Sequence, residues 1–192
     1  MTTLALIRHG HTPWNRAGRI QGRTDIALDP DAITELQGYK LPVEWQKADL
    51  VASPLLRAKE TAKIIADCSP KIVSSLIEMD WGAWEGLRGV DLKADKSSGF
   101  RDIEDWGWDY CPPNGESPQD VWDRIKPWVM GLRKTTVAVC HIGIMRMILA
   151  KAHGWDFDGP APFKIKRNRL YTIEIKDRLQ IVDIEPIRLE AR

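Results

Sequence analysis

The chain has 192 residues, of which 43% are apolar and 29% are charged, a composition typical of a globular protein with a substantial core. Its 28 basic and 27 acidic residues give a formal net charge of +1, which argues against a dedicated nucleic-acid binder, because such proteins usually carry a strongly basic domain. The sequence has no apolar run of about 18 residues that would cross a membrane, and it starts without the features of a signal peptide. We therefore expect one cytoplasmic domain over residues 1–192, with neither nucleic acid nor membrane as a partner.

The three cysteines are Cys68, Cys111 and Cys140, which lie far apart and lack the spacing of metal ligands. We interpret them as reduced thiols in or near the core. The sequence accordingly predicts no metal site and no cofactor.

A short apolar run over residues 3–7, bounded by Gly10 and Pro13, predicts a buried strand that ends in a loop. Arg8 and His9 follow this strand, and ligands of open α/β sheets bind beyond the carboxyl ends of the strands. The guanidinium fork of arginine matches phosphate oxygens, and an unprotonated imidazole can act as a nucleophile. An Arg-His-Gly triplet also occurs by chance in surface loops. The residues at the other strand ends therefore have to distinguish a functional site from a chance triplet.

Residues 16–29 lack regular periodicity but contain several glycines and arginines. This segment could fold over an anionic ligand, although a solvated basic loop explains Arg16 and Arg23 nearly as well. Pro30 then opens a helix expected over residues 30–40.

Residues 49–52 predict a second strand, followed by Ser53 as N-cap and Pro54 as first residue of a helix that runs to Ala66. Arg57 falls in the first turn of this helix, where positive charge is unfavourable because the helix start is itself partly positive. A bound anion would satisfy both groups. The functional interpretation of Arg57 is therefore preferred.

Residues 71–74 predict a third strand, and the loop over residues 76–86 that follows places carboxylates among tryptophans and glycines. A carboxyl group against apolar surface can hold a proton near neutral pH and deliver it to a leaving group. Glu78, Asp80 and Glu85 are all candidates for this role. Composition alone does not choose among them.

The middle of the chain is the least regular part. Residues 86–115 predict short helices and a flap over the pocket, and four of the nine tryptophans fall at positions 81, 84, 106 and 108, where we expect core and pocket wall. Ser117 and Asp120 resemble a capping box that opens a helix. Pro127 predicts a kink or a break of that helix near Lys126.

Residues 136–140 are the most strand-like run of the sequence, and His141 follows them in the same topological position as His9. A helix should run from there to about Ala152, and we assign His153 at its end no chemistry. Alternating residues at 170–175 and 179–184 predict a hairpin at the edge of the sheet.

Four predicted strands thus end in Arg8 and His9, in Ser53 with Arg57, in the Glu78 loop, and in His141. If these strands lie side by side and parallel, the side chains converge in an electropositive pocket without metal ligands, which suits a phosphate dianion.

These residues resemble the histidine phosphatases, also called the phosphoglycerate mutase-like superfamily. The matching pieces span residues 4–149 and comprise Arg8-His9-Gly10 with Thr12 and Trp14-Asn15, Gly18-Arg19 and Gln21-Gly22, Ser53 to Ala58 with Thr61, Glu78 with Trp81-Gly82 and Trp84-Glu85-Gly86, Gly115-Glu116-Ser117, and His141 with Gly143 and Arg146. The resemblance implies an α/β three-layer sandwich with a mostly parallel central sheet and helices on both faces.

The resemblance also implies roles for individual residues. His9 would be the nucleophile that forms a transient phosphohistidine, and Glu78, the first acid of its loop, would be the proton donor. The non-bridging phosphate oxygens would be held by Arg8, Arg57 and His141, with Asn15 assisting. Substrate would be bound on the sides lined by Gln21, Gly22 and Gly143.

Two positions depart from the family pattern: His11 replaces the usual Glu or Gln, and Ile142 replaces a residue that is often small. Neither change removes a catalytic group, but both could alter pocket shape and substrate preference.

We expect a histidine acid phosphatase-type enzyme that hydrolyses small phosphomonoesters. A phosphoglycerate mutase is the first alternative, disfavoured because the family's mutases carry longer insertions and tails than 192 residues leave room for. A catalytically inactive relative that binds phosphorylated ligands is the second. Exposed tryptophans could support a homodimer.

Overall fold

The computed structural model describes residues 2–192, which form a seven-stranded sheet in the order β4-β3-β5-β1-β6-β7, with β8 also paired to β6. The parallel strands are β1 (Thr2–Arg8), β3 (Asp49–Ala52), β4 (Lys71–Ile72) and β5 (Thr136–Cys140). The antiparallel strands are β6 (Arg169–Ile175), β7 (Leu179–Ile181) and β8 (Ile187–Arg188). A separate ribbon joins β2 (Tyr39–Lys40) to β9 (Glu190–Ala191).

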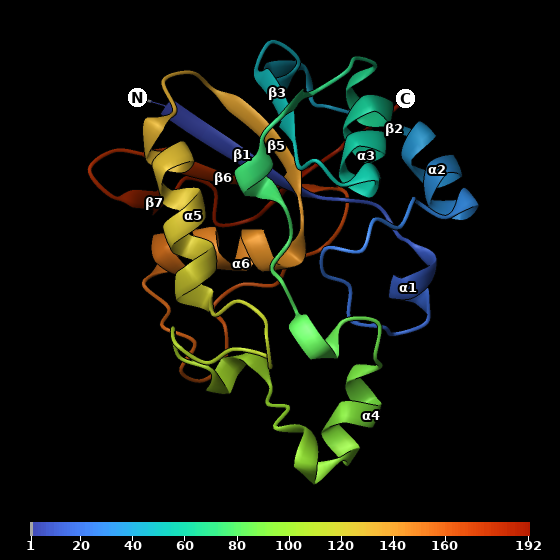
Figure 1. Ribbon diagram of the computed structural model, residues 1–192. Coiled ribbons are helices and arrows are strands. Elements are labelled where there is room, and N and C mark those ends of the chain that lie inside the picture. Colours follow the sequence, from blue (N-terminus) through green and yellow to red (C-terminus); the bar gives the residue numbers. More distant parts are fainter. Residues whose placement is uncertain (1) are drawn as a thin grey trace.

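Helices cover both faces of this sheet (Figure 1). The α-helices are α1 (Pro13–Arg16), α2 (Pro30–Gln37), α3 (Leu56–Ala66), α4 (Gly89–Ala94), α5 (Pro118–Gly131) and α6 (Ile142–His153). Short 3₁₀ turns lie at Val43–Trp45, Ser74–Leu76, Gly82–Trp84, Lys96–Ser98 and Ile103–Asp105.

The central strands carry runs of apolar residues because both of their faces are buried. In β1, Leu4 and Leu6 belong to a core with α5 and α6, whereas Ala5 and Ile7 belong to a second core with α2 and α3. All four side chains are at most 1% exposed. The predicted three-layer α/β sandwich is confirmed.

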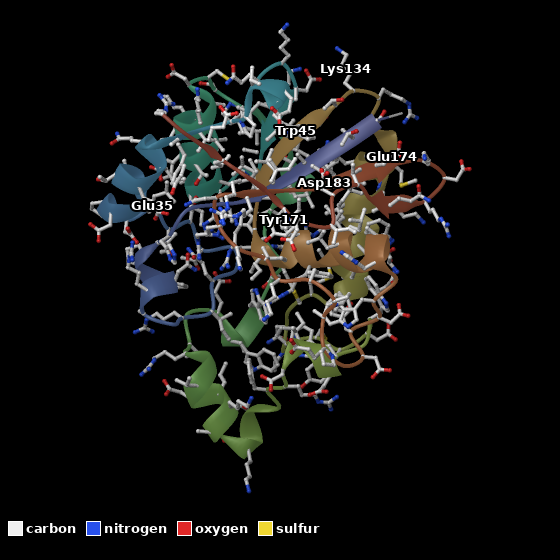
Figure 2. The ribbon with its side chains drawn as sticks, turned by 180° about the vertical axis from the view of Figure 1, so that it is seen from behind. Glu35, Trp45, Lys134, Tyr171, Glu174 and Asp183 are labelled. Carbon is white, nitrogen blue, oxygen red and sulfur yellow. The ribbon has the colours of Figure 1, made fainter. Side chains whose placement is uncertain are left out.

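The parallel strands deliver their carboxyl ends to one edge of the sheet. Lys134, just before β5, marks the opposite edge at the top of Figure 2. The residues between 86 and 115, including α4, extend beyond the carboxyl edge at the bottom of Figure 1. This edge is therefore where the side chains that follow β1, β3 and β5 can meet.

The predicted strands at 49–52 and 136–140 have the observed bounds, but two other elements are shorter than expected. The strand predicted over 71–74 ends at Ile72, because Ser74 begins a 3₁₀ turn. The helix predicted over 30–40 ends at Gln37, and Tyr39 and Lys40 instead pair with Glu190 and Ala191. This pairing spans almost the whole chain, so local sequence could not reveal it.

The start of α3 corrects the assignment of Ser53 as its N-cap. The helix begins at Leu56, and the hydroxyl of Ser53 lies 2.7 Å from His141 Nε2. The Leu56 amide donates instead to Asp25 Oδ1, at 2.7 Å. A side chain from another segment thus satisfies the helix start.

Helix α5 starts as the sequence predicts, but it does not break at Pro127. Ser117 and Asp120 form the reciprocal capping box. The helix nevertheless runs unbroken to Gly131. Pro127 lies on the exposed side, where water can satisfy the Asp123 carbonyl that loses its helical donor.

Burial was predicted for tryptophans and for all three cysteines, and the structure confirms it for only some of them. Trp84 and Trp106 are buried, as predicted, and all nine tryptophans are buried or half-buried, so exposed tryptophans do not argue for a dimer. Cys140 is buried, but Cys68 and Cys111 are exposed, which corrects their placement near the core. Both follow helix or loop ends, where the apolar patterning is too weak to predict burial.

Within residues 2–192, no helix has the length and apolar character needed to cross a membrane.

The capping box of α5 gives a stability prediction. Ser117→Ala removes the acceptor of the Asp120 amide and the partner of its carboxylate, and should lower the free energy of unfolding by about 1 kcal/mol. Urea titration measures the effect. Lys126→Ala, at an exposed position of the same helix, should change it by less than about 0.5 kcal/mol. Equal stabilities of the two variants would contradict the assigned role of the cap.

Candidate active site

His9 lies just beyond β1 and is 3% exposed. Its Nδ1 is 2.6 Å from the carbonyl oxygen of Gly10, which can only accept a hydrogen bond. Nδ1 therefore carries the proton in the neutral ring, and Nε2 carries the lone pair. Burial, followed by the charges of Arg57 and Arg8, holds the pKa of His9 well below its ordinary value of 6.5. The imidazole is thus a neutral base with one defined reactive nitrogen.

A second, fully buried imidazole faces the first one. The rings of His9 and His141 are 5.1 Å apart at their centroids. Arg57 Nε donates to His141 Nδ1 at 3.2 Å, so His141 Nε2 carries the proton and donates to Ser53 Oγ at 2.7 Å. Burial and the proximity of His9 and Arg57 lower the pKa of His141 well below 6.5. The histidines that follow β1 and β5 therefore meet, as the sequence predicts.

Arg57 is in the first turn of α3, as predicted, and is fully buried. Its guanidinium donates to the carbonyls of Gly22, at 2.7 Å, and Thr24, at 3.0 Å, as well as to His141. Backbone carbonyls of the loop after α1 thus act as acceptors for the Arg57 guanidinium. These hydrogen bonds hold that loop against the site. Burial lowers the pKa of Arg57 from 12.5.

Three further guanidinium groups belong to this cluster: Arg8 and Arg167 lie near His9, and Arg146 lies near Arg8 and Glu78. Burial, together with the charges of Arg167 and Arg146, lowers the pKa of Arg8 to about 9. Burial lowers the pKa of Arg167 to about 10, and that of Arg146 is also lowered. All remain charged at neutral pH. Arg8 Nε is buried without a hydrogen-bond partner, which is costly unless an anion occupies the site.

Glu78 is the carboxylic acid of this cluster and is 2% exposed. Its Oε1 accepts from the Met79 amide at 2.8 Å and its Oε2 from the Gly143 amide at 3.2 Å. Burial raises the pKa of Glu78 above 4.5, and this effect exceeds the opposing influence of the two amides and of the nearby arginines. The carboxyl group therefore holds a proton more readily than an exposed glutamate.

Gly143 must be a glycine for this contact to form. A Cβ at this position would overlap Oε1 of Glu78. Gly22 is constrained in the same way, because a Cβ there would lie 2.7 Å from Oε2 of Glu85. The two glycines predicted to line the substrate side thus allow close approach of backbone to carboxylates.

Asn15 and Gln21 form a polar network beside His9. Asn15 Nδ2 donates to Gln21 Oε1 at 3.2 Å, and the same oxygen accepts from Thr12 Oγ1 at 2.8 Å. Gln21 Nε2 is buried and has no partner. This amide is a free donor for a ligand oxygen.

Carboxylates fix the loops that carry these groups. Glu116 accepts from Arg124 Nε at 2.8 Å and from Arg23 Nη2 at 2.8 Å, and Arg124 also donates to the carbonyls of Ile77 and Glu78. Arg16 pairs with Asp29 at 2.6 Å. Arg16 and Arg23 therefore stabilise the loop that was interpreted as a possible ligand cover.

Sequence reasoning missed Arg167, which comes from the segment before β6. Its Nε donates to the carbonyl oxygen of His9 at 3.0 Å, and its Nη2 donates to Asn15 Oδ1 at 2.9 Å. Because β6 runs antiparallel to β1, its start lies at the carboxyl end of β1. A basic residue just before the antiparallel neighbour of β1 was the available signal.

The two departures from the family pattern lie at the margin of the cluster. The Nδ1 of His11 is buried without a partner, and burial lowers the pKa of this imidazole. Ile142 lines a cavity of about 240 Å³ together with Arg146 and Trp155. Within residues 2–192, no three His, Cys, Asp or Glu side chains are grouped so that they could hold a metal ion.

The fold and the cluster together define a class of protein, an α/β domain that presents a buried histidine pair among guanidinium groups. A family model of the histidine phosphatase superfamily (branch 1) matches residues 4–184. The chain belongs to this superfamily.

Similar proteins carry two kinds of name. The phosphoglycerate mutase of Schizosaccharomyces pombe is 34% identical over 162 residues, which cover 79% of this chain and 74% of that protein. The metal-independent phosphoserine phosphatase of Arabidopsis thaliana is 27% identical over 201 residues, 95% of this chain and 80% of that protein. The crystal structure of phosphoglycerate mutase from Thermus thermophilus matches with a TM-score of 0.71 at 28% identity, covering 98% and 99% of the two chains. Several other relatives match over only 58–60% of their own length.

The contacts of Arg167 give a second prediction. Arg167→Met removes a cation that lowers the pKa of His9, the hydrogen bond to the His9 carbonyl and the hydrogen bond to Asn15. The pKa of His9 should rise toward 6.5, as measured by NMR titration of the imidazole, and turnover of an aryl phosphate should fall on the order of tenfold. Lys166→Met, one residue earlier, should leave the pKa of His9 unchanged. An unchanged pKa in both variants would refute the assigned role of Arg167.

Proposed function

We propose that this protein is a phosphatase that hydrolyses small phosphomonoesters through a phosphohistidine intermediate on His9. One observation carries the proposal: His9 is neutral and its Nε2 lone pair is available, although several guanidinium groups surround it. The positive charge of these groups exceeds the negative charge that Glu78, the one buried carboxyl group beside them, could supply. A phosphate dianion supplies the missing negative charge. Superfamily membership and the phosphatase names among the relatives support the same activity.

In the first step, Nε2 of His9 attacks phosphorus, and the bond from phosphorus to the leaving alkoxide breaks. Glu78 donates its proton to that oxygen, so the leaving group departs as a neutral alcohol. Arg8 and Arg57 stabilise the charge that spreads over the three non-bridging oxygens, and His141 donates its Nε2 proton to one of these oxygens in place of Ser53 Oγ. The covalent step divides one difficult displacement into two easier ones.

In the second step, water attacks the phosphohistidine. Glu78, now ionised, accepts a proton from this water, and His9 leaves as the neutral ring. The Gly10 carbonyl keeps Nδ1 protonated throughout, so the same nitrogen can accept the next phosphoryl group. Asn15 and the unpaired amide of Gln21 are proposed to bind substrate oxygens.

Phosphoglycerate mutase activity is the second candidate, because relatives of this chain carry that name. A mutase returns the phosphoryl group to a second hydroxyl, whereas a phosphatase transfers it to water. Incubation with 3-phosphoglycerate, with and without a bisphosphoglycerate primer, separates the two by product. Free phosphate supports the proposal, and primer-dependent isomerisation without phosphate release would overturn it.

Removal of the nucleophile gives a third prediction. His9→Ala should lower phosphate release from p-nitrophenyl phosphate at least about a thousandfold. The exposed control Lys126→Ala should retain full activity. Activity of His9→Ala close to that of the unchanged protein would exclude the nucleophile assignment.

The opposite pKa shifts of His9 and Glu78 give a fourth prediction, on pH dependence. His9 must be neutral, so kcat/KM should fall only when the pH drops through its lowered pKa, below 6.5. Glu78 must be protonated, so kcat/KM for an alkyl phosphate should fall as the pH rises through its raised pKa, above 4.5.

Glu78→Gln tests the alkaline limb. This variant should lose that limb and lower kcat/KM for an alkyl phosphate on the order of a hundredfold or more, but should lower kcat/KM for p-nitrophenyl phosphate much less. Nitrophenolate leaves without a proton, and kcat/KM does not include the later attack of water on the phosphohistidine. Equal losses for the two substrates would show that Glu78 does not act as the proton donor.

A further inference from the structure

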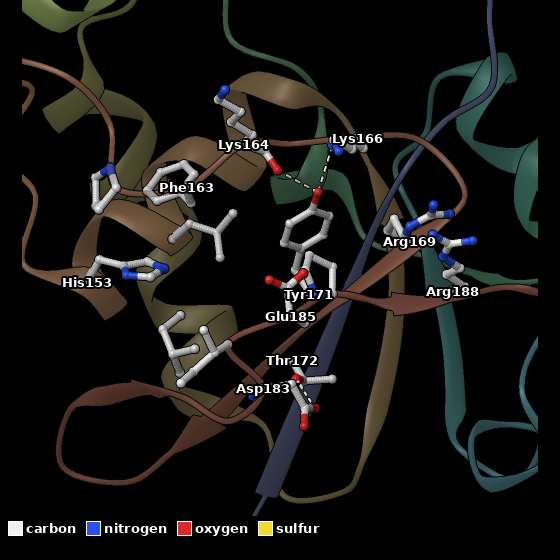
Figure 3. A pocket seen from close by; sticks show the side chains of 15 residues that line it. His153, Phe163, Lys164, Lys166, Arg169, Tyr171, Thr172, Asp183, Glu185 and Arg188 are labelled. Carbon is white, nitrogen blue, oxygen red and sulfur yellow. Dashed lines mark hydrogen bonds between the residues drawn. The ribbon is translucent and has the colours of Figure 1, made fainter.

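A cavity of about 660 Å³ lies apart from the histidine pair, between the end of α6, the segment 162–166 and the strands β6 to β8 (Figure 3). We name it the β6 cavity and define it by Leu149, Phe163, Lys164, Arg169, Tyr171 and Arg188. Its volume is in the range of small-molecule sites. The proposed catalytic residues Arg8, His9, Glu78 and His141 do not line it.

One side of the β6 cavity is strongly basic. Arg169 and Arg188 are directly opposite each other in the pairing of β6 with β8, and Figure 3 shows them together at one side of the cavity. Like charges opposite each other destabilise a sheet. Arg169 Nη1 donates only to the neighbouring Asn168 carbonyl, and neither guanidinium forms an ion pair with a carboxylate of residues 2–192. An anion between the two groups would relieve this repulsion.

The charge of the remaining lining also favours an anion. Lys164 and Lys166 add two cations without ion pairs, while Asp183 and Glu185 are the acidic members of the lining. Asp183 accepts a hydrogen bond from Thr172 Oγ1 at 2.5 Å, which directs this carboxylate to the protein. Basic groups therefore outnumber acidic ones by four to two.

The other side of the cavity carries the aromatic rings of Phe163 and His153. Phe163 stacks on His153, with ring centroids 5.1 Å apart and planes inclined by 29°. Trp155 packs edge-on against Phe163 at 5.6 Å and fixes that ring. Figure 3 shows Phe163 and His153 on the side of the cavity away from the two arginines. A planar ring can pack on this surface.

The segment that borders the cavity is well anchored. Tyr171 Oη accepts from the Lys166 amide at 2.6 Å and donates to the Lys164 carbonyl at 2.7 Å. Arg167, the next residue, is hydrogen-bonded at the catalytic cluster instead. The β6 cavity is thus a preformed space with its own walls, and His9 is not among the residues that line it.

From these observations we infer that the β6 cavity is a second binding site, for a small organic anion with a planar ring. Arg169 and Arg188 bind the anionic group, and Phe163 packs against the ring. A charged end and an apolar end at opposite sides fix the orientation of such a ligand.

Naphthalene-1-sulfonate is a suitable probe, because it has a flat ring and one anionic group but no phosphate ester to hydrolyse. Calorimetric titration of the whole chain should show one saturable site. The double variant Arg169→Gln/Arg188→Gln should weaken binding at least about tenfold, and Phe163→Leu about threefold. Arg133→Gln, outside the cavity, should bind as the unchanged protein does.

Arg8→Gln distinguishes this site from the catalytic cluster and should leave binding of the sulfonate unchanged. Loss of binding in Arg8→Gln would assign the probe to the catalytic cluster and overturn the inference. Absence of saturable binding to the unchanged protein would overturn it too. The inference would also be overturned if the double variant had the melting temperature of the unchanged protein and bound the sulfonate with equal affinity.

Discussion

The hydrogen bond from His9 Nδ1 to the Gly10 carbonyl is the interaction on which the candidate active site depends. A carbonyl oxygen only accepts, so it determines which ring nitrogen keeps the proton and which one can react. The same hydrogen bond could also form with a protonated imidazolium ring, but the surroundings of His9 disfavour protonation. Burial and the charges of Arg57 and Arg8 make a positive charge on His9 unfavourable. Together they define a neutral nucleophile.

The sheet makes this arrangement possible because β3, β5 and β1 are neighbours and parallel. Their carboxyl ends bring Arg57, His141 and His9 to one place, where no regular backbone pairing has to be interrupted. Charge on the surrounding loops is balanced locally, as in the pairs of Arg16 with Asp29 and Arg23 with Glu116. Charge at the centre is not balanced, and this imbalance makes the site suitable for a phosphate dianion.

Much of the fold was predictable because its signals are local. The strand runs at 49–52 and 136–140 are apolar on both faces, and the Ser117 capping box and the histidines at strand ends are recognisable within a few residues. The convergence of Arg57, His9 and His141 followed from one assumption, that these strands are parallel neighbours.

The features that escaped prediction depend on contacts between distant segments. Arg167 contacts His9 across 158 residues of sequence, and Asp25 replaces Ser53 at the start of α3. The pairing of Tyr39 with Ala191 shortened α2. Pro127 remained helical because its position on the helix is exposed, and exposure depends on which face of α5 packs against the core. Apart from the basic residue just before β6, these contacts leave no pattern in the neighbouring sequence.

The position of the phosphoryl group on the trapped enzyme tests the central claim most directly. Rapid mixing with substrate, quenching in alkali and ³¹P NMR or mass spectrometry of the His9 peptide distinguish phosphate on Nε2 from phosphate on Nδ1. We expect phosphate on Nε2 of His9, because Nδ1 is bound to the Gly10 carbonyl. Phosphate on Nδ1, on another residue, or on no residue during turnover would contradict it.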